Sequence, residues 1–187
     1  MIGMPAPSDA VSTYIFAKDG NRPFLTRCVF ADGSEMEFML KTDSISFPGS
    51  AKGLRAIEDI LRGFNIDYEN IYTFCLSRPS DSDRRHFACH WLVGMSAKSD
   101  GRPWVGCGRY DWHFAADQTC LVDRLVITID LMKTLPATDL AATMNWLSGL
   151  PYPWCTPNDA VKDMPRIEEL AAIETYLKQA RPIPPEQ

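Results

Sequence analysis

Residues 87–132 constrain the fold more than any other part of the chain, because they form a pattern of three successive long strands. Alternation between apolar and polar residues with a period of two is typical of a strand with one buried and one more polar face. The middle strand, over 104–114, shows this clearly. Its even positions carry aromatic residues and glycines: Trp104, Gly106, Gly108, Tyr110, Trp112 and Phe114. We therefore expect an antiparallel meander at the centre of the fold.

Helical patterns and shorter strands precede the meander. Apolar residues at helical spacing, capping residues and turn residues set their limits. The expected order is a helix over 8–18, a second helix after Asn21, a strand over 35–40, a loop over 41–50, a helix over 51–63 and a strand over 69–77. The last elements before the C-terminal region are the strands of the meander, over 85–97, 104–115 and 121–132.

The residues after the meander have a different character. We expect a short helix over 136–150, a stiff apolar loop over 151–155 and a final amphipathic helix capped by Asp163. The chain is thus predicted to consist of an α+β domain over 8–132 and a C-terminal helical extension over 133–187.

Composition limits the classes of function. A chain of 187 residues with 45% hydrophobic residues has enough apolar side chains for the core of one globular domain. A net charge of -5 argues against nucleic acid and anionic membranes as partners. The first residues lack a signal-peptide pattern, and the six cysteines include no C-x-x-C pair, which favours a reduced, cytoplasmic protein. No nucleotide or metal-binding motif occurs, so we expect neither a cofactor nor a metal.

The order of elements over 8–132 resembles the nuclear transport factor 2-like superfamily, and within it the SnoaL-like polyketide cyclases and ketosteroid isomerases. The similarity rests on Tyr14 in the first helix, on the segments 30–37 and 53–57, and on the strand that ends with 110–114. The resemblance implies a cone-shaped, curved antiparallel sheet packed on N-terminal helices. It also implies a ligand pocket inside the cone and a homodimer formed through the outer face of the sheet.

The resemblance implies three candidate catalytic residues. Tyr14 stands where a first-helix tyrosine of the isomerases donates a hydrogen bond to an oxyanion, and Tyr110 stands where those enzymes have a second acid. Both would act as hydrogen-bond donors toward a carbonyl group. The alternative for Tyr14 is a core position with its hydroxyl bonded to the backbone. Asp43, in the loop before the helix over 51–63, is the first candidate base, and a capping role in a turn is its alternative.

Four further residues are candidate ligand contacts. Trp112 and Phe114 lie on the aromatic side of the middle strand, and aromatic side chains are common in ligand pockets. Phe38 occupies the position where the isomerases have their carboxylate base, so the usual isomerase chemistry is not expected. His90 is the last candidate, with an outward position at a surface or dimer interface as its alternative.

Two hypotheses for function follow. The first is a SnoaL-like protein with an enclosed apolar pocket for a small organic molecule, such as a polyketide or a steroid-like ring. Such a pocket would serve binding or cofactor-free cyclase, dehydratase or isomerase chemistry beside a carbonyl. The second hypothesis is a non-catalytic dimeric binding or assembly module, in which the outer strand faces matter more than the pocket.

Overall fold

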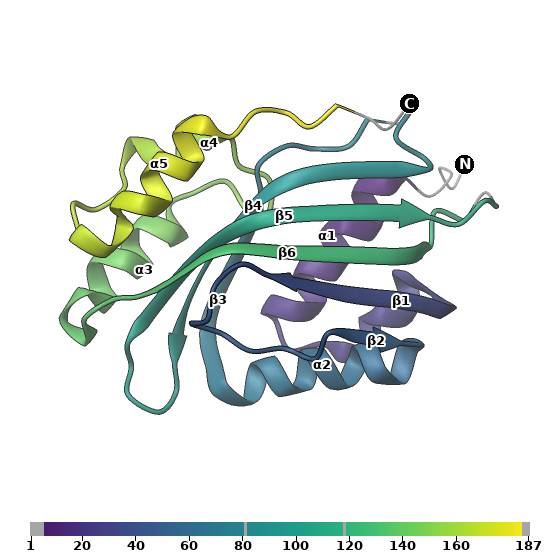
Figure 1. Cartoon of the computed structure of the whole chain (residues 1–187), viewed down its shortest axis with the longest axis horizontal. Coiled ribbons are helices and arrows are strands. Elements are labelled where there is room, and N and C mark those ends of the chain that lie inside the picture. Colours follow the sequence, from purple (N-terminus) through teal and green to yellow (C-terminus); the bar gives the residue numbers. More distant parts are fainter. Residues whose placement is uncertain (1–5, 81, 118, 185–187) are drawn as a thin grey trace.

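The fold is built on one curved, six-stranded sheet (Figure 1). A computed structural model describes residues 6–80, 82–117 and 119–184. The strand order is β2-β1-β6-β5-β4-β3, and neighbouring strands are antiparallel except for β1 and β6, which are parallel. The strands are β1 (Phe30–Leu40), β2 (Ser50–Lys52), β3 (Tyr68–Cys75), β4 (His86–Ala97), β5 (Pro103–Phe114) and β6 (Val122–Thr134). The predicted meander corresponds to β4, β5 and β6.

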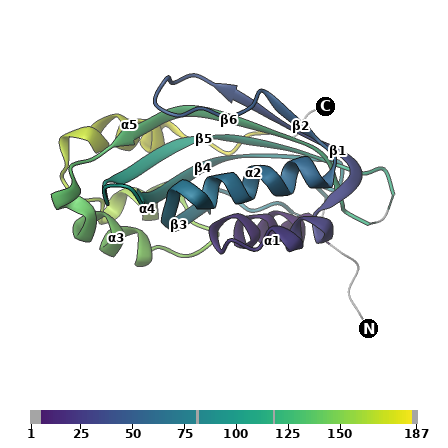
Figure 2. The same ribbon diagram turned by 90° about the horizontal axis from the view of Figure 1, so that it is seen from below.

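Two helices fill the concave side of the sheet (Figure 2). They are α1 (Pro7–Asp19) and α2 (Leu54–Asp67), and the short 3-10 helix η1 (Pro23–Cys28) follows α1. Their apolar sides pack against the inward side chains of the strands, among them Trp91, Tyr110 and Trp112. This is the α+β cone that the sequence predicts, with its main core between the helices and the sheet.

The C-terminal helices cover part of the opposite, convex face (Figure 1). They are α3 (Leu140–Ser148), α4 (Pro157–Lys162) and α5 (Ala171–Gln179). Successive side chains along a strand point to opposite faces of the sheet. The side chains of Leu92, Val105 and Cys107 point away from the main core, face these helices and form a second core with them. The convex face of β3, β4 and β5 is therefore covered by the chain's own extension.

Tyr176 of α5 fixes the extension to the sheet through polar contacts. Its hydroxyl oxygen lies 2.9 Å from the carbonyl oxygen of Gly108, 3.1 Å from a carboxylate oxygen of Asp130 and 2.8 Å from Nδ1 of His90. The homodimer through the outer face of the sheet stays a prediction. Met39, on β1, is 55% exposed.

Gly94 marks the closest approach of the extension to the sheet. A Cβ atom at this position would lie 3.1 Å from Cδ2 of Leu147 in α3, and closer still to Cδ1. We expect Gly94→Ala to lower the free energy of unfolding by about 1–3 kcal/mol, because an added methyl overpacks a buried contact. In a Leu147→Ala background the same change should cost clearly less, since its neighbour is gone. Equal costs in both backgrounds, measured by urea unfolding, would contradict this packing.

The limits of several predicted elements differ from the observed ones. Strand β1 begins at Phe30 rather than residue 35, because the turn-like residues 32–34 lie in an irregularity of the β1–β6 pairing. The three-residue strand β2 and helix α4 were not predicted. Asp163 does not cap the final helix; it follows the C-terminal end of α4, and α5 begins only at Ala171. The predicted domain boundary after residue 132 falls inside β6. Among the described residues, no helix is long and apolar enough to cross a membrane.

Candidate functional site

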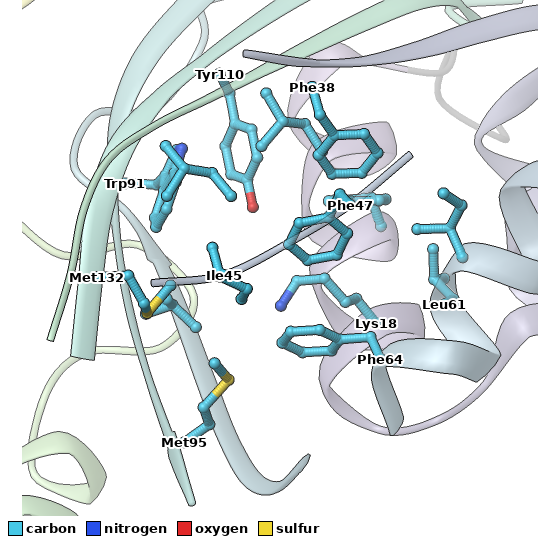
Figure 3. A pocket seen from close by; sticks show the side chains of 15 residues that line it. Lys18, Phe38, Ile45, Phe47, Leu61, Phe64, Trp91, Met95, Tyr110 and Met132 are labelled. Carbon is cyan, nitrogen blue, oxygen red and sulfur yellow. The ribbon is translucent and has the colours of Figure 1, made fainter. Parts of the chain in front are cut away.

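The candidate site is a cavity of about 50 Å³ between the concave face of the sheet and the helices α1 and α2 (Figure 3). Apolar and aromatic side chains form most of its wall. The lining residues come from α1, α2, four strands and the loop 41–49: Tyr14, Lys18, Phe38, Ile45, Phe47, Ile60, Leu61, Phe64, Trp91, Val93, Met95, Tyr110, Ile127, Ile129 and Met132.

Lys18 is the one cationic side chain in this wall. It lies one helical turn after Tyr14 on α1, so both side chains face the sheet. Its Nζ donates a hydrogen bond to Oγ1 of Thr73 at 2.7 Å and lies 4.9 Å from the centroid of the Phe64 ring. Figure 3 shows the Lys18 nitrogen and the Tyr110 oxygen directed into the space between the aromatic rings.

The charge of Lys18 is balanced by Asp19. The two groups form an ion pair at 2.8 Å, and their side chains are only 11% and 5% exposed. The Asp19 carboxylate also accepts hydrogen bonds from the backbone N–H of Thr73, the Thr73 hydroxyl and the Tyr152 hydroxyl, at 2.7, 2.8 and 3.0 Å. The pair is thus held rigidly at the end of α1 and adds no net charge to the site.

Two buried tyrosines supply hydroxyl groups. The rings of Tyr14 and Tyr110 meet edge to face, 6.1 Å apart between centroids. Burial is the main reason why the pKa of each tyrosine is raised well above its ordinary value. Both hydroxyls therefore remain protonated near neutral pH and serve as donors rather than as bases.

Known proteins resemble this chain in structure but not in recognisable sequence. No family model matches it, and no curated protein matches it in sequence. RV0760c from Mycobacterium tuberculosis superposes with a TM-score of 0.55 at 13% identity, covering 71% of this chain and 98% of that protein. A hexachlorocyclohexane dehydrochlorinase, LinA type 2, has a TM-score of 0.54 at 13% identity, covering 70% and 87%.

A third solved structure is a hypothetical protein with a ketosteroid isomerase-like fold from Catenulispora acidiphila. Its TM-score is 0.52 at 14% identity, covering 66% of this chain and 85% of that protein. The chain has the nuclear transport factor 2-like fold. The family resemblance predicted from the sequence is therefore confirmed at the level of fold. The Catenulispora protein was solved with trimethylamine, and RV0760c also with estradiol-17β-hemisuccinate.

The nuclear transport factor 2-like cone brings three of the predicted site residues to one cavity: Tyr14, Tyr110 and Phe38. Trp112 and Phe114 are buried on the same side of β5 but lie outside the cavity lining. The Trp112 ring packs against Tyr14 instead, with centroids 5.2 Å apart. Trp112 therefore supports the cavity wall from behind, through its contact with Tyr14.

Asp43 and His90 lie away from the cavity. Asp43 is exposed on the loop 41–49 and does not line the cavity. His90 was predicted as a ligand contact with an outward position as the alternative, and the outward position is the observed one. Burial, with a smaller effect from the charge of Arg109, lowers the pKa of His90. Neither residue is placed to contact a ligand in the cavity.

Lys18 and Trp91 carry polar groups in the cavity wall, and the sequence analysis selected neither as a site residue. The helical spacing places Lys18 on the same face of the first helix as Tyr14, but lysine is rarely buried, so this position alone did not mark it as a site residue. The indole Nε1 of Trp91 is buried without a hydrogen-bond partner among the described residues. An unsatisfied buried donor is uncommon, and it lies on a side chain that lines the cavity.

Proposed function

We propose that the protein binds a small, neutral organic molecule with a carbonyl oxygen in the cavity between the sheet and α1. The observation that carries this proposal is the Lys18 ammonium group, which faces a cavity walled by aromatic and apolar side chains (Figure 3). Lys18 has three N–H donors, and two bonds to protein acceptors, Asp19 and Thr73, are present among the described residues. The third donor is available to a ligand oxygen.

The charge balance of the site favours a neutral ligand over an anion. Asp19 already compensates Lys18, so a ligand carboxylate would bring an uncompensated negative charge into an apolar environment. Burial of an unpaired charge is costly, whereas a carbonyl oxygen needs only a hydrogen bond. The Lys18 ammonium, the tyrosine hydroxyls and the Trp91 indole are all donors, which matches an acceptor oxygen. The small ligands bound by RV0760c and the Catenulispora protein support a binding role for this fold.

Binding is better supported than catalysis by proton abstraction. Proton abstraction beside a carbonyl needs a base within hydrogen-bonding reach of the substrate. Among the described residues, no carboxylate or histidine lines the cavity, and the Asp19 carboxylate is fully engaged by its hydrogen-bond donors. The site therefore supplies hydrogen-bond donors for a carbonyl oxygen, but it lacks the base that cyclase, dehydratase or isomerase chemistry would need.

Lys18→Met tests the proposal. We expect it to weaken the binding of 2-butanone at least tenfold, because a hydrogen bond from a charged donor contributes about 1.5–3 kcal/mol. Binding is measured by NMR titration, through the indole N–H resonance of Trp91 in the cavity wall. Lys178→Met is the matched control, since Lys178 is exposed on α5 and pairs only with Glu174 among the described residues. Butyrate, the anionic probe of similar length, should bind more weakly than 2-butanone. Equal binding of 2-butanone by the Lys18→Met and Lys178→Met variants would refute the proposed role of Lys18.

A further inference from the structure

The inner cavity shares one wall with a larger outer groove. The groove has a volume of about 800 Å³ and runs between α2 and the segment 44–52. The residues that line both spaces are Ile45, Phe47, Ile60 and Phe64. Two voids on either side of one layer of side chains become a single space when that layer moves.

The inner cavity by itself is small for an organic ligand. Its volume of about 50 Å³ holds only a few water-sized spheres. Pockets for drug-sized ligands usually measure roughly 300–1,000 Å³. The outer groove lies inside this range, so the two spaces together have the size that the inner cavity lacks. A polyketide or steroid-like ring does not fit the inner cavity alone.

Phe47 is the central part of the shared wall. Its ring stacks in parallel on Phe38, with centroids 4.6 Å apart, and lies 6.3 Å from the ring of Phe64. The backbone bonds that tie the loop 41–49 to the sheet lie at its two ends, from Lys41 to Ile129 and from Phe38 to Gly49. The middle of the loop is thus held to the fold mainly by the side chains of Ile45 and Phe47, which a ligand can displace.

The groove differs from the cavity in polarity. Its outer parts carry serines and charged residues, namely Ser44, Ser46, Ser50, Lys52, Asp59 and Asp67. The cavity wall contains one charged side chain, Lys18. A molecule that occupies both spaces would therefore have a carbonyl at its inner end, an apolar body beside the phenylalanines and an outer end that tolerates water.

We infer that the ligand is an elongated carbonyl compound whose chain passes Phe47 and lies in the groove along α2. This inference rests on the proposed function, because it assigns the inner end of the same ligand to the cavity. The loop 41–49 then acts as the wall that the chain displaces on binding, and α2 forms the floor of the outer part of the site.

Gly63 offers a direct test, because it lines the groove but not the cavity, and a Cβ atom there meets no heavy atom within 4 Å. Gly63→Phe adds a ring toward this open space. The matched control is Arg55→Phe, on an exposed position of α2 that lines neither space. The probes are 2-butanone and 2-undecanone, and the Trp91 indole resonance reports binding in the cavity.

We expect affinity to rise about fourfold for each methylene group that leaves water. Gly63→Phe should weaken the binding of 2-undecanone at least tenfold and change the affinity for 2-butanone less than twofold. Arg55→Phe should change neither affinity. If Gly63→Phe leaves 2-undecanone unaffected while both ketones still bind, the groove is not part of the site and the inference fails, although the proposed function stands. If neither ketone shifts the Trp91 resonance, the proposed function itself fails, and the inference fails with it.

Discussion

Replacement of Asp19 by alanine is expected to lower the free energy of unfolding by about 3–5 kcal/mol, because it leaves the buried Lys18 ammonium without its counter-ion. The change also removes the acceptor for the Thr73 and Tyr152 hydroxyls and for the Thr73 backbone N–H. Chemical denaturation followed by circular dichroism measures the loss.

Two comparisons separate the ion pair from general damage. In a Lys18→Met background, Asp19→Ala should lower the free energy of unfolding by much less, because no buried cation is left unpaired. Glu174→Ala breaks the exposed pair with Lys178 on α5 and should cost less than about 1 kcal/mol. If Asp19→Ala lowers the free energy of unfolding as little as Glu174→Ala does, Lys18 is not held as a buried ammonium, and the description of the site is wrong.

Gly108→Ala is expected to destabilise the fold by about 3 kcal/mol or more. A Cβ atom at Gly108 would collide with the backbone carbonyl oxygen of Thr128 on β6 and would lie 2.7 Å from Cζ2 of Trp91. A backbone oxygen in a paired strand cannot move aside as the end of a side chain can, so the added methyl must separate β5 from β6. One of the two irregularities of this pairing lies between Cys107 and Gly108. Thermal unfolding of the variant should show a much lower Tm, or no cooperative transition.

Gly63→Ala is the matched control for Gly108→Ala. A Cβ atom there meets open space, and alanine favours a helix over glycine by up to about 1 kcal/mol. This variant should be as stable as the unmodified protein or slightly more so. Similar Tm values for the two variants would show that β5 and β6 do not approach each other as closely at Gly108 as described.

The sequence was sufficient for the fold because its strongest signal, the alternation over 104–114, belongs to the central strand of the sheet. The same alternation placed Tyr110 on the aromatic face of this strand, which is the inner face of the sheet. It gave no sign of β2, because a strand of three residues is too short for a period to show. The residues 32–34 favour a turn by composition, yet Phe30 and Glu35 on either side of them pair with β6, so they lie within β1 as an irregularity of the pairing.

The candidate site was only partly predictable. The family resemblance predicts where the pocket lies, and Tyr14, Tyr110 and Phe38 were predicted as site residues from it. Lys18 required knowledge of what lies beside it, since Thr73 is 55 residues away along the chain and only tertiary packing brings the two together. The role of Phe47 depends on the path of a loop, which local patterns do not encode. Helix α4 could have been predicted from the sequence, because Thr156 caps it by accepting a hydrogen bond from the backbone N–H of Asp159 and Pro157 is its first residue.

The most direct test of the central proposal is the infrared C=O stretch of carbonyl-¹³C-labelled 2-undecanone bound to the protein. Donation from the Lys18 ammonium to the carbonyl oxygen weakens the C=O bond, so the band should lie at lower frequency than in an alkane solvent. In the Lys18→Met variant it should return toward the alkane value. A bound ketone whose band already lies at the alkane frequency in the unmodified protein, or whose band is unchanged by Lys18→Met, would contradict recognition of a carbonyl group by Lys18.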